Sequence, residues 1–277
     1  MAKIFRYETE KDMCSAFMLI AQKYGWVCYP ETCGFDIVLL DKETGVQIGI
    51  EAKQQFNAHV LSQCVSNEYS FYNSDGPDYR AVLVPDGGAK GLSDLARQLN
   101  ITVIRAVGEP VKPEKNQTKI SRNGSVYYTD AFTGMVPNIT NNRKYMPWDY
   151  NRGAGWFDRW PNNRLNLPEY VPYVVAGDKA PIKLTHWKIS AIKICILMER
   201  KGWLDKKDFN DLNISMSRWQ QYWMVKGDVR GVWIKGEHFP DYRKEHPTNF
   251  KQIEADFDKW GVKMLDRMKA RGSGTLI

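Results

Sequence analysis

The chain has 277 residues and a net charge of +7, with 43% hydrophobic and 26% charged residues. These values match ordinary globular proteins and exclude a collagen-like, coiled-coil or wholly disordered chain. No apolar run approaches the roughly 20 residues that span a bilayer, and the polar stretch Met1–Met13 is unlike a secretory signal. The five cysteines include no Cys-x-x-Cys pair, which argues against structural zinc or a disulfide framework and favours a cytoplasmic protein without membrane contact.

The charge is unevenly distributed along the chain. Residues 1–108 have a net charge of −3 and residues 109–277 a net charge of +10, and the second part also holds nine of the ten tryptophans. A basic, aromatic-rich half is typical of a protein that binds a polyanion, most simply nucleic acid. A solvated basic surface is the alternative.

The apolar pattern of residues 1–108 predicts helices that alternate with strands. Helices are expected over 9–24, 59–69 and 91–99, and strands over 26–29, 35–40, 46–52, 80–84 and 101–107. Such an order indicates an α/β domain in which helices flank a mixed sheet.

The remaining sequence divides at about residue 184. Residues 109–184 read as a linker with a small hairpin at 120–129 and a basic, aromatic stretch at 143–168, which contains Arg152 and Arg159. The arginines and aromatics of this stretch would either clamp a nucleic-acid backbone or pack as an ordinary linker. Residues 185–277 predict a mainly helical domain, which ends in one long helix over 249–268.

The hairpin formed by residues 35–52 brings charged residues together. If its turn centres near Glu43, residues whose numbers sum to about 86 face one another, so Asp36 lies beside Ile50–Glu51 on the neighbouring strand. Lys53 shares one strand face with Glu51. Two adjacent carboxylates repel unless a cation lies between them, and Mg²⁺ prefers one or two carboxylates together with substrate phosphate. These residue types therefore fit metal-dependent phosphodiester hydrolysis. The alternative is an exposed hairpin with a surface ion pair between Glu51 and Lys53.

The segments Gly34-Phe35-Asp36-Ile37-Val38-Leu39-Leu40 and Ile48-Gly49-Ile50-Glu51-Ala52-Lys53 resemble the PD-(D/E)xK nuclease superfamily. The resemblance covers residues 8–107 and implies a restriction-endonuclease-like fold. It also implies that Asp36 and Glu51 are metal ligands and that Lys53 is the catalytic lysine. Phe35 stands where the name of the superfamily has proline.

Some members of the superfamily have a further acidic residue on the first helix. Glu10 is the candidate for this role, as a third metal ligand beside Asp36 and Glu51, with Glu8 and Asp12 as alternatives. Members with a glutamine near the lysine make Gln55 a further site candidate, and Gln63 could fill the same role.

Residues 185–235 resemble a winged helix-turn-helix in their order of helix, helix, turn, helix and β-ribbon. The third helix would enter the major groove of DNA, and the ribbon would contact the DNA backbone. The expected nucleic-acid contacts are Ser215, Ser217, Arg218 and Gln221 on the helix and Lys226, Arg230 and Lys235 on the ribbon, with Arg152 and Arg159 from the linker.

Together these observations predict a Mg²⁺-dependent DNA endonuclease with domains 1–108, 109–184 and 185–277, in which Mn²⁺ substitutes for Mg²⁺. The domain order resembles transposon endonuclease subunits. A homodimer is expected because cutting both strands needs two sites, and the winged-helix-like domain can also serve as a site for a protein partner. The alternatives are a non-catalytic DNA-binding regulator and a nuclease acting on RNA.

Overall fold

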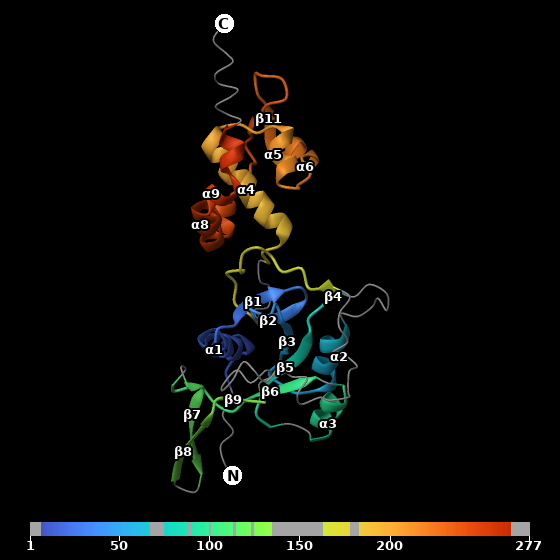
Figure 1. Ribbon diagram of the computed structural model, residues 1–277, viewed down its shortest axis with the longest axis vertical. Coiled ribbons are helices and arrows are strands. Elements are labelled where there is room, and N and C mark those ends of the chain that lie inside the picture. The colour runs from blue at the N-terminus through green and yellow to red at the C-terminus, as the bar shows by residue number, and fades with distance from the viewer. Residues whose placement is uncertain are drawn as a thin grey trace. The chain divides into compact units, whose positions relative to one another are not determined.

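The chain forms two compact units in the computed structural model (Figure 1). The first comprises residues 1–167 and 174–183, and the second comprises residues 168–173 and 184–277. The structure describes residues 7–66, 75–87, 90–99, 101–112, 115–122, 125–134, 163–177 and 183–266. Within these ranges, every helix is too short or too polar to cross a membrane.

The first unit is built on a six-stranded mixed sheet with the order β1-β2-β3-β5-β6-β9. The strands are β1 (Val27–Thr32), β2 (Phe35–Leu40), β3 (Gln47–Ala52), β5 (Tyr79–Pro85), β6 (Thr102–Ala106) and β9 (Phe132–Thr133). Strands β3, β5 and β6 run parallel to one another, whereas β1–β2, β2–β3 and β6–β9 pair antiparallel. The predicted α/β fold with a mixed sheet is therefore confirmed.

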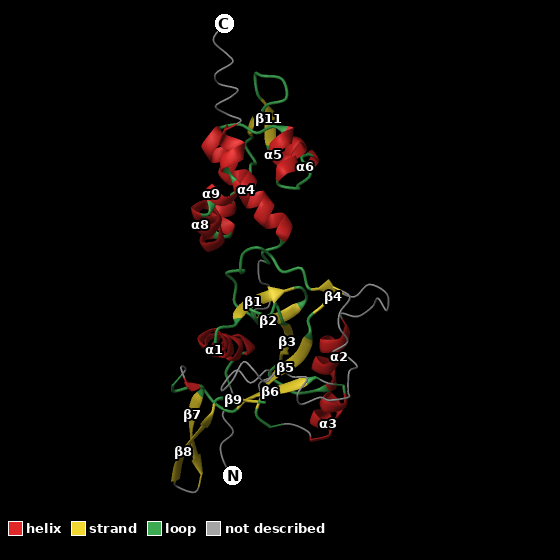
Figure 2. Ribbon diagram, in the orientation of Figure 1, coloured by secondary structure: helices red, strands yellow, loops and turns green. Residues whose placement is uncertain are grey.

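Helices cover both faces of this sheet (Figures 1 and 2). Helix α1 (Glu10–Lys23) packs on one face, and helices α2 (Ala58–Ser66) and α3 (Lys90–Gln98) pack on the other. Because side chains alternate along a strand, Leu83 of β5 joins the core under α1 while its neighbour Val82 joins the core under α2 and α3. The sheet is thus buried on both sides, as parallel strands require.

Part of the predicted linker belongs to the first unit. A hairpin of β7 (Gln117–Arg122) and β8 (Ser125–Asp130) is longer than the predicted 120–129, and β9 follows it and pairs with β6. The fully buried Asn116 fixes the base of the hairpin, because its side-chain amide donates to the carbonyl of Phe132 and accepts from the N–H of Phe132. The polar sequence gives no local sign of this long-range pairing.

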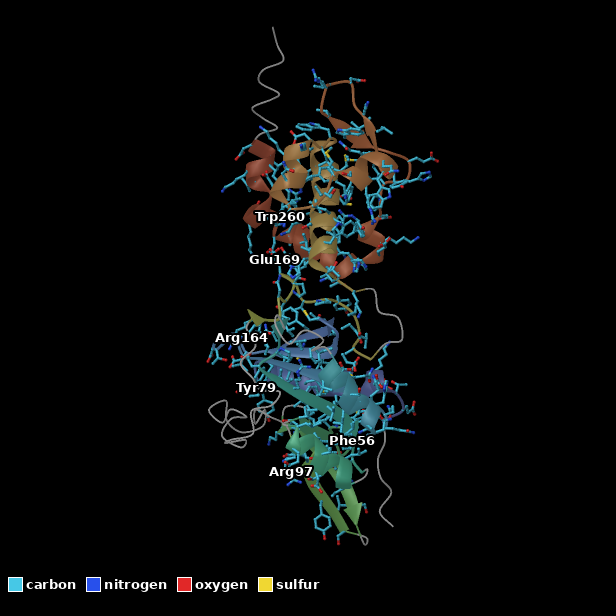
Figure 3. The ribbon with its side chains drawn as sticks, turned by 90° about the vertical axis from the view of Figure 1, so that its right-hand side faces the viewer. Phe56, Tyr79, Arg97, Arg164, Glu169 and Trp260 are labelled. Carbon is cyan, nitrogen blue, oxygen red and sulfur yellow. The ribbon has the colours of Figure 1, made fainter. Side chains whose placement is uncertain are left out.

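Residues 163–167 also return to the first unit. Strand β10 (Asn163–Arg164) pairs with β4 (Asp75–Gly76), and Arg164 Nε lies 2.9 Å from a carboxylate oxygen of Asp78 (Figure 3). The Gln47 side chain makes two hydrogen bonds with the backbone of Leu165. The predicted linker over 109–184 is therefore wrong for these residues.

The second unit is mainly helical. Its elements are α4 (His186–Lys201), α5 (Lys206–Asp211), α6 (Ser217–Tyr222), β11 (Met224–Lys226), β12 (Trp233–Lys235), α7 (Tyr242–Glu245), α8 (Pro247–Ala255) and α9 (Phe257–Trp260). Helix α4 is buried along most of its length, and the fully buried Trp219 of α6 packs against the ring of Phe209 in α5.

The predicted single helix over 249–268 is wrong. The chain turns at Asp256, which separates α8 from α9, and again at Gly261. The apolar side chains Ile253, Phe257 and Met264 all lie in the core of the unit. Their spacing also fits one continuous helix, so the apolar pattern does not reveal the turns.

Candidate active site

Helix α1 begins beside the charged end of the central hairpin. Thr9 caps the helix, because its hydroxyl oxygen accepts a hydrogen bond from the N–H of Asp12 at 3.1 Å. Glu10 is therefore the first helical residue, where a carboxylate is favoured by the helix dipole. Glu10 Oε1 lies 3.0 Å from Lys53 Nζ, although the two residues are 43 positions apart in the sequence.

The β2–β3 hairpin supplies the other charged groups. Ile37 pairs with Ile50, so Asp36 and Glu51 are the next residues on the two strands. The Asp36 carboxylate accepts a hydrogen bond from the N–H of Ala52 at 2.7 Å, and the same oxygen lies 3.5 Å from Lys53 Nζ. The structure thus brings Glu10, Asp36 and Lys53 into contact.

Glu51 is the most buried charged residue of this cluster, with 5% of its surface exposed. Burial, and then the negative charge of Asp36, raise the pKa of the Glu51 carboxyl to about 8, although Lys53 opposes the shift. This carboxyl therefore holds a proton at neutral pH unless another cation lies beside it.

Lys53 is the one cation in contact with these carboxylates among the described side chains. Burial lowers its pKa, but the charge of Asp36 and the hydrogen bond to Glu10 outweigh burial, so the pKa of the Lys53 ammonium is raised overall. The ammonium is consequently charged at neutral pH and positioned by carboxylates on both sides.

The donor chemistry of the cluster fits a divalent cation. Over the described parts of the chain, no three His, Cys, Asp or Glu side chains form a ready-made metal site. Mg²⁺, however, commonly takes only one or two protein carboxylates and completes its shell with water and phosphate. Asp36 and Glu51 supply two carboxylates, and a cation beside them would let buried Glu51 ionise.

Sequence reasoning missed Glu31, a further carboxylate near the cluster. Glu31 has a left-handed φ of +49°, which is uncommon for a residue other than glycine, and its carboxylate accepts a hydrogen bond from the N–H of Gly177 at 2.8 Å. Burial raises the pKa of Glu31, and Asp36 adds to the shift. A Cβ atom on Gly177 would lie only 3.2 Å from the Glu10 side chain, so glycine permits this close approach.

The other candidates near the lysine lie outside these contacts. Gln55 is exposed, and so are Glu8 and Asp12, of which Asp12 accepts a hydrogen bond from the Thr9 hydroxyl. Gln63 lies half-buried on α2. Gln54, which the sequence analysis did not select, buries its side-chain Nε2 without a hydrogen-bond partner among the described residues. Its place directly after Lys53 was the only available signal.

The predicted nucleic-acid contacts of the second unit are exposed. They lie before and on α6 (Ser215, Ser217, Arg218 and Gln221) and on or between β11 and β12 (Lys226, Arg230 and Lys235). Lys235 also lies over the ring of Phe239. Arg152 and Arg159 lie outside the described residues.

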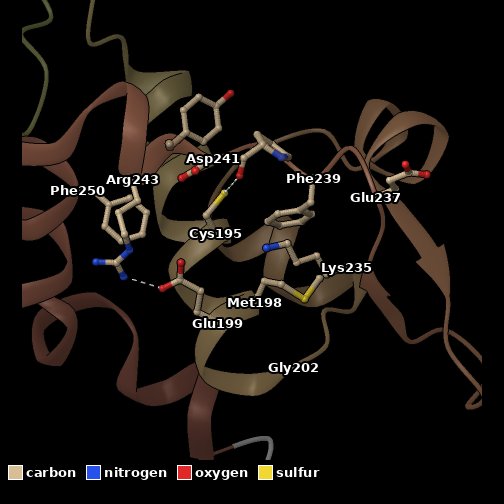
Figure 4. Close-up of a pocket in the computed structure, with 12 residues that line it drawn as sticks. Cys195, Met198, Glu199, Gly202, Lys235, Glu237, Phe239, Asp241, Arg243 and Phe250 are labelled. Atoms are coloured by element: carbon tan, nitrogen blue, oxygen red, sulfur yellow. Dashed lines mark hydrogen bonds and ion pairs between the residues drawn. The ribbon is translucent and has the colours of Figure 1, made fainter.

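The second unit contains a pocket of about 700 Å³ (Figure 4). Arg243 in its wall donates to Glu199 at 2.7 Å and to Glu254 at 3.1 Å, so this cation is already paired. The Cys195 thiol donates to the carbonyl of Pro240, and burial raises the pKa of Cys195, which leaves the thiol protonated at neutral pH. We therefore assign this pocket no role in catalysis.

Comparison of the chain with protein-family models, curated proteins and solved structures found no match.

The raised pKa of Glu51 predicts an unusual pH dependence of stability. In the absence of divalent cations, the folded protein keeps a proton on Glu51 up to a pH of about 8. The unfolded chain loses this proton near pH 4.5. Between these values the unfolded state binds fewer protons, so the contribution of Glu51 to the free energy of unfolding falls by roughly 1.4 kcal/mol per pH unit.

Chemical denaturation of wild type and Glu51→Gln in EDTA tests this expectation. We expect the variant to gain stability relative to wild type as the pH rises from 5 to 8, and Mg²⁺ to stabilise wild type only. Glu43→Gln, which removes an exposed carboxyl of the same hairpin, is the control and should track wild type. If the difference in unfolding free energy between Glu51→Gln and wild type stayed constant from pH 5 to 8, it would contradict the raised pKa of Glu51.

Proposed function

We propose that the protein is a divalent-cation-dependent DNA endonuclease, with its catalytic centre in the first unit. Asp36 and Glu51 would hold the cation, which when bound would supply a water of lowered pKa and neutralise charge on the phosphodiester. Mg²⁺ is the expected ion, and Mn²⁺ substitutes for it. Hydrolysis adds water at phosphorus and breaks one bridging P–O bond.

The observation that carries this proposal is the contact of Lys53 Nζ with both Asp36 and Glu10 beside the buried Glu51. Lys53 donates hydrogen bonds toward a phosphate oxygen and stabilises the charge that develops there. Glu10 is a positioning residue, because it holds the ammonium at the end of β3. The charge of Asp36 acting on the buried Glu51 carboxyl is unfavourable unless a cation lies beside the two carboxylates, which supports a bound ion.

The fold gives further support. The order α1-β1-β2-β3-α2, followed after the two-residue β4 by β5, resembles a restriction-endonuclease-like core. The charged residues lie at the beginning of β2 and the end of β3, two strands inside the sheet, so the proposed site is at the ends of the strands. This support is architectural, and the chemistry rests on the side chains themselves.

We further propose that the second unit places the nuclease on DNA. The order α4-α5-α6-β11-β12 resembles a winged helix, in which α6 enters the major groove and the β11–β12 ribbon contacts the backbone. The exposed Arg218 and Gln221 have the side-chain chemistry to read base edges. The proposal includes a homodimer that cuts both strands, a protein partner as a second use of this unit, and a cytoplasmic location.

A cleavage assay over several substrates tests the proposed reaction. Wild-type protein is incubated with supercoiled plasmid, linear duplex, branched DNA, single-stranded DNA and RNA, each with Mg²⁺, Mn²⁺ or EDTA. We expect cutting of DNA in either metal and none in EDTA. Tight DNA binding without cutting in any metal would support a non-catalytic regulator, and preferential cutting of RNA would replace DNA as the substrate.

A further inference from the structure

The β7–β8 hairpin is a firmly anchored element with exposed side chains. Val126, Tyr127 and Tyr128 follow one another on β8 and are 51%, 52% and 56% exposed. Because successive side chains of a strand point to opposite faces, both faces of β8 are open to solvent. Figure 1 shows the hairpin extending away from the sheet of the first unit.

The base of the hairpin, by contrast, is held by several hydrogen bonds. The N–H of Ala131 donates to the carbonyl of Asn116 at 2.7 Å, and the Thr118 hydroxyl donates to the carbonyl of Glu109 at 2.8 Å. The N–H of Val107 donates in turn to the carbonyl of Ala131 at 2.7 Å. The hairpin is therefore presented rigidly rather than as a loose loop.

One face of the hairpin combines cations with an aromatic ring. Lys119 pairs directly with Tyr128 across the two strands, so the two side chains share a face. Lys112 Nζ lies 5.3 Å from the centre of the Tyr128 ring, and both lysines are exposed. Within β7 and β8 the one carboxylate is Asp130, which pairs with Gln117 at the base of the hairpin and lies on the same face as Lys119 and Tyr128. With Lys112 and Lys119 this face still carries a net positive charge, so it is complementary to a polyanion.

We infer that the β7–β8 hairpin is a DNA-binding arm that lies in the major groove of duplex DNA through its Lys112–Lys119–Tyr128 face. A two-stranded β-ribbon fits the major groove, which is about 12 Å wide, whereas the deep, narrow major groove of duplex RNA excludes it. The two lysines contact phosphates, and Tyr128 packs against the groove wall. The choice of DNA as ligand rests on the proposed function, but the arm is defined by contacts away from Asp36, Glu51 and Lys53.

Binding without cleavage tests the arm separately from the nuclease. Fluorescence anisotropy of the full chain with a labelled duplex in EDTA gives the Kd at several salt concentrations. For Lys112→Gln/Lys119→Gln we expect at least a tenfold higher Kd. The slope of the logarithm of the binding constant against the logarithm of the salt concentration should become shallower by roughly 1.8, which is about 0.9 for each lost phosphate contact. Tyr128→Ser should also weaken binding.

Two control proteins match these changes. Lys23→Gln/Lys42→Gln removes two exposed cations elsewhere in the first unit, and Tyr127→Ser alters the opposite face of the hairpin. Both should bind within twofold of wild type, and thermal melting checks the fold of every variant. The inference would be overturned if the arm and control variants lost DNA affinity equally, or if the wild-type protein did not bind DNA. It would also be overturned if the arm variants lost the same affinity for duplex RNA. Loss of binding in the arm variants of a protein that never cleaves would support the arm and refute the nuclease.

Discussion

Lys53→Met is expected to lower the rate of DNA cleavage at saturating DNA by about 10²- to 10³-fold, because it removes the proposed donor to the phosphate. Glu51→Gln should cause a loss at least as large, because it removes one of the two carboxylates proposed to hold the cation. Both rates are measured as single-turnover cleavage of a labelled duplex in Mg²⁺. DNA affinity in EDTA should change little in either variant.

A matched control separates catalysis from general charge. Lys42→Met removes an exposed lysine from the same hairpin and should cleave at the wild-type rate. Lys53→Arg keeps the charge beside Asp36 and Glu10 but alters its geometry, so it should melt like wild type and still cleave more slowly. Wild-type cleavage by Lys53→Met would remove the lysine from the mechanism.

The second large effect is expected in the stability of the second unit. Lys201 and Asp208 form an ion pair of 2.6 Å, and their side chains are 1% and 0% exposed. Asp208 also accepts a hydrogen bond from the N–H of Asp205 at the start of α5. Asp208→Ala leaves the Lys201 ammonium buried without this partner, so the unfolding free energy should fall by about 3–5 kcal/mol.

Chemical denaturation monitored by tryptophan fluorescence measures this loss. Lys259→Gln is the control, because the ion pair between Lys259 and Asp256 has the same length of 2.6 Å but its lysine side chain is 76% exposed. That change should cost about 0–1 kcal/mol. Similar losses in the two variants would mean that burial does not determine the contribution of the Lys201–Asp208 pair.

The sequence was most informative where local patterns decide the structure. The position of the hairpin turn predicted that the numbers of facing residues sum to about 86. The observed pairing of Ile37 with Ile50 shifts this register by one position. Apolar periodicity likewise placed α1 and β2 within one or two residues. These features depend on interactions between residues near one another in the chain, so alternation and turn chemistry suffice to predict them.

Long-range contacts could not be read from the sequence. The hydrogen bond from Gly177 to Glu31 joins residues 146 positions apart, and it depends on a left-handed backbone at a glutamate, which no residue pattern predicts. The pairing of β9 with β6 similarly places Phe132 in the main sheet, which no local pattern predicts. Prediction from the sequence therefore placed Asp36, Glu51, Lys53 and Glu10 near one another but missed the contact between Gly177 and Glu31.

The position of a bound divalent ion tests the central claim most directly. Crystals of the protein soaked in Mn²⁺ give an anomalous difference map in which manganese stands out from lighter atoms. We expect a peak beside the carboxylates of Asp36 and Glu51, which disappears in Glu51→Gln crystals soaked in the same way. A map without a peak at these carboxylates, or a peak that persists in the variant, would contradict it.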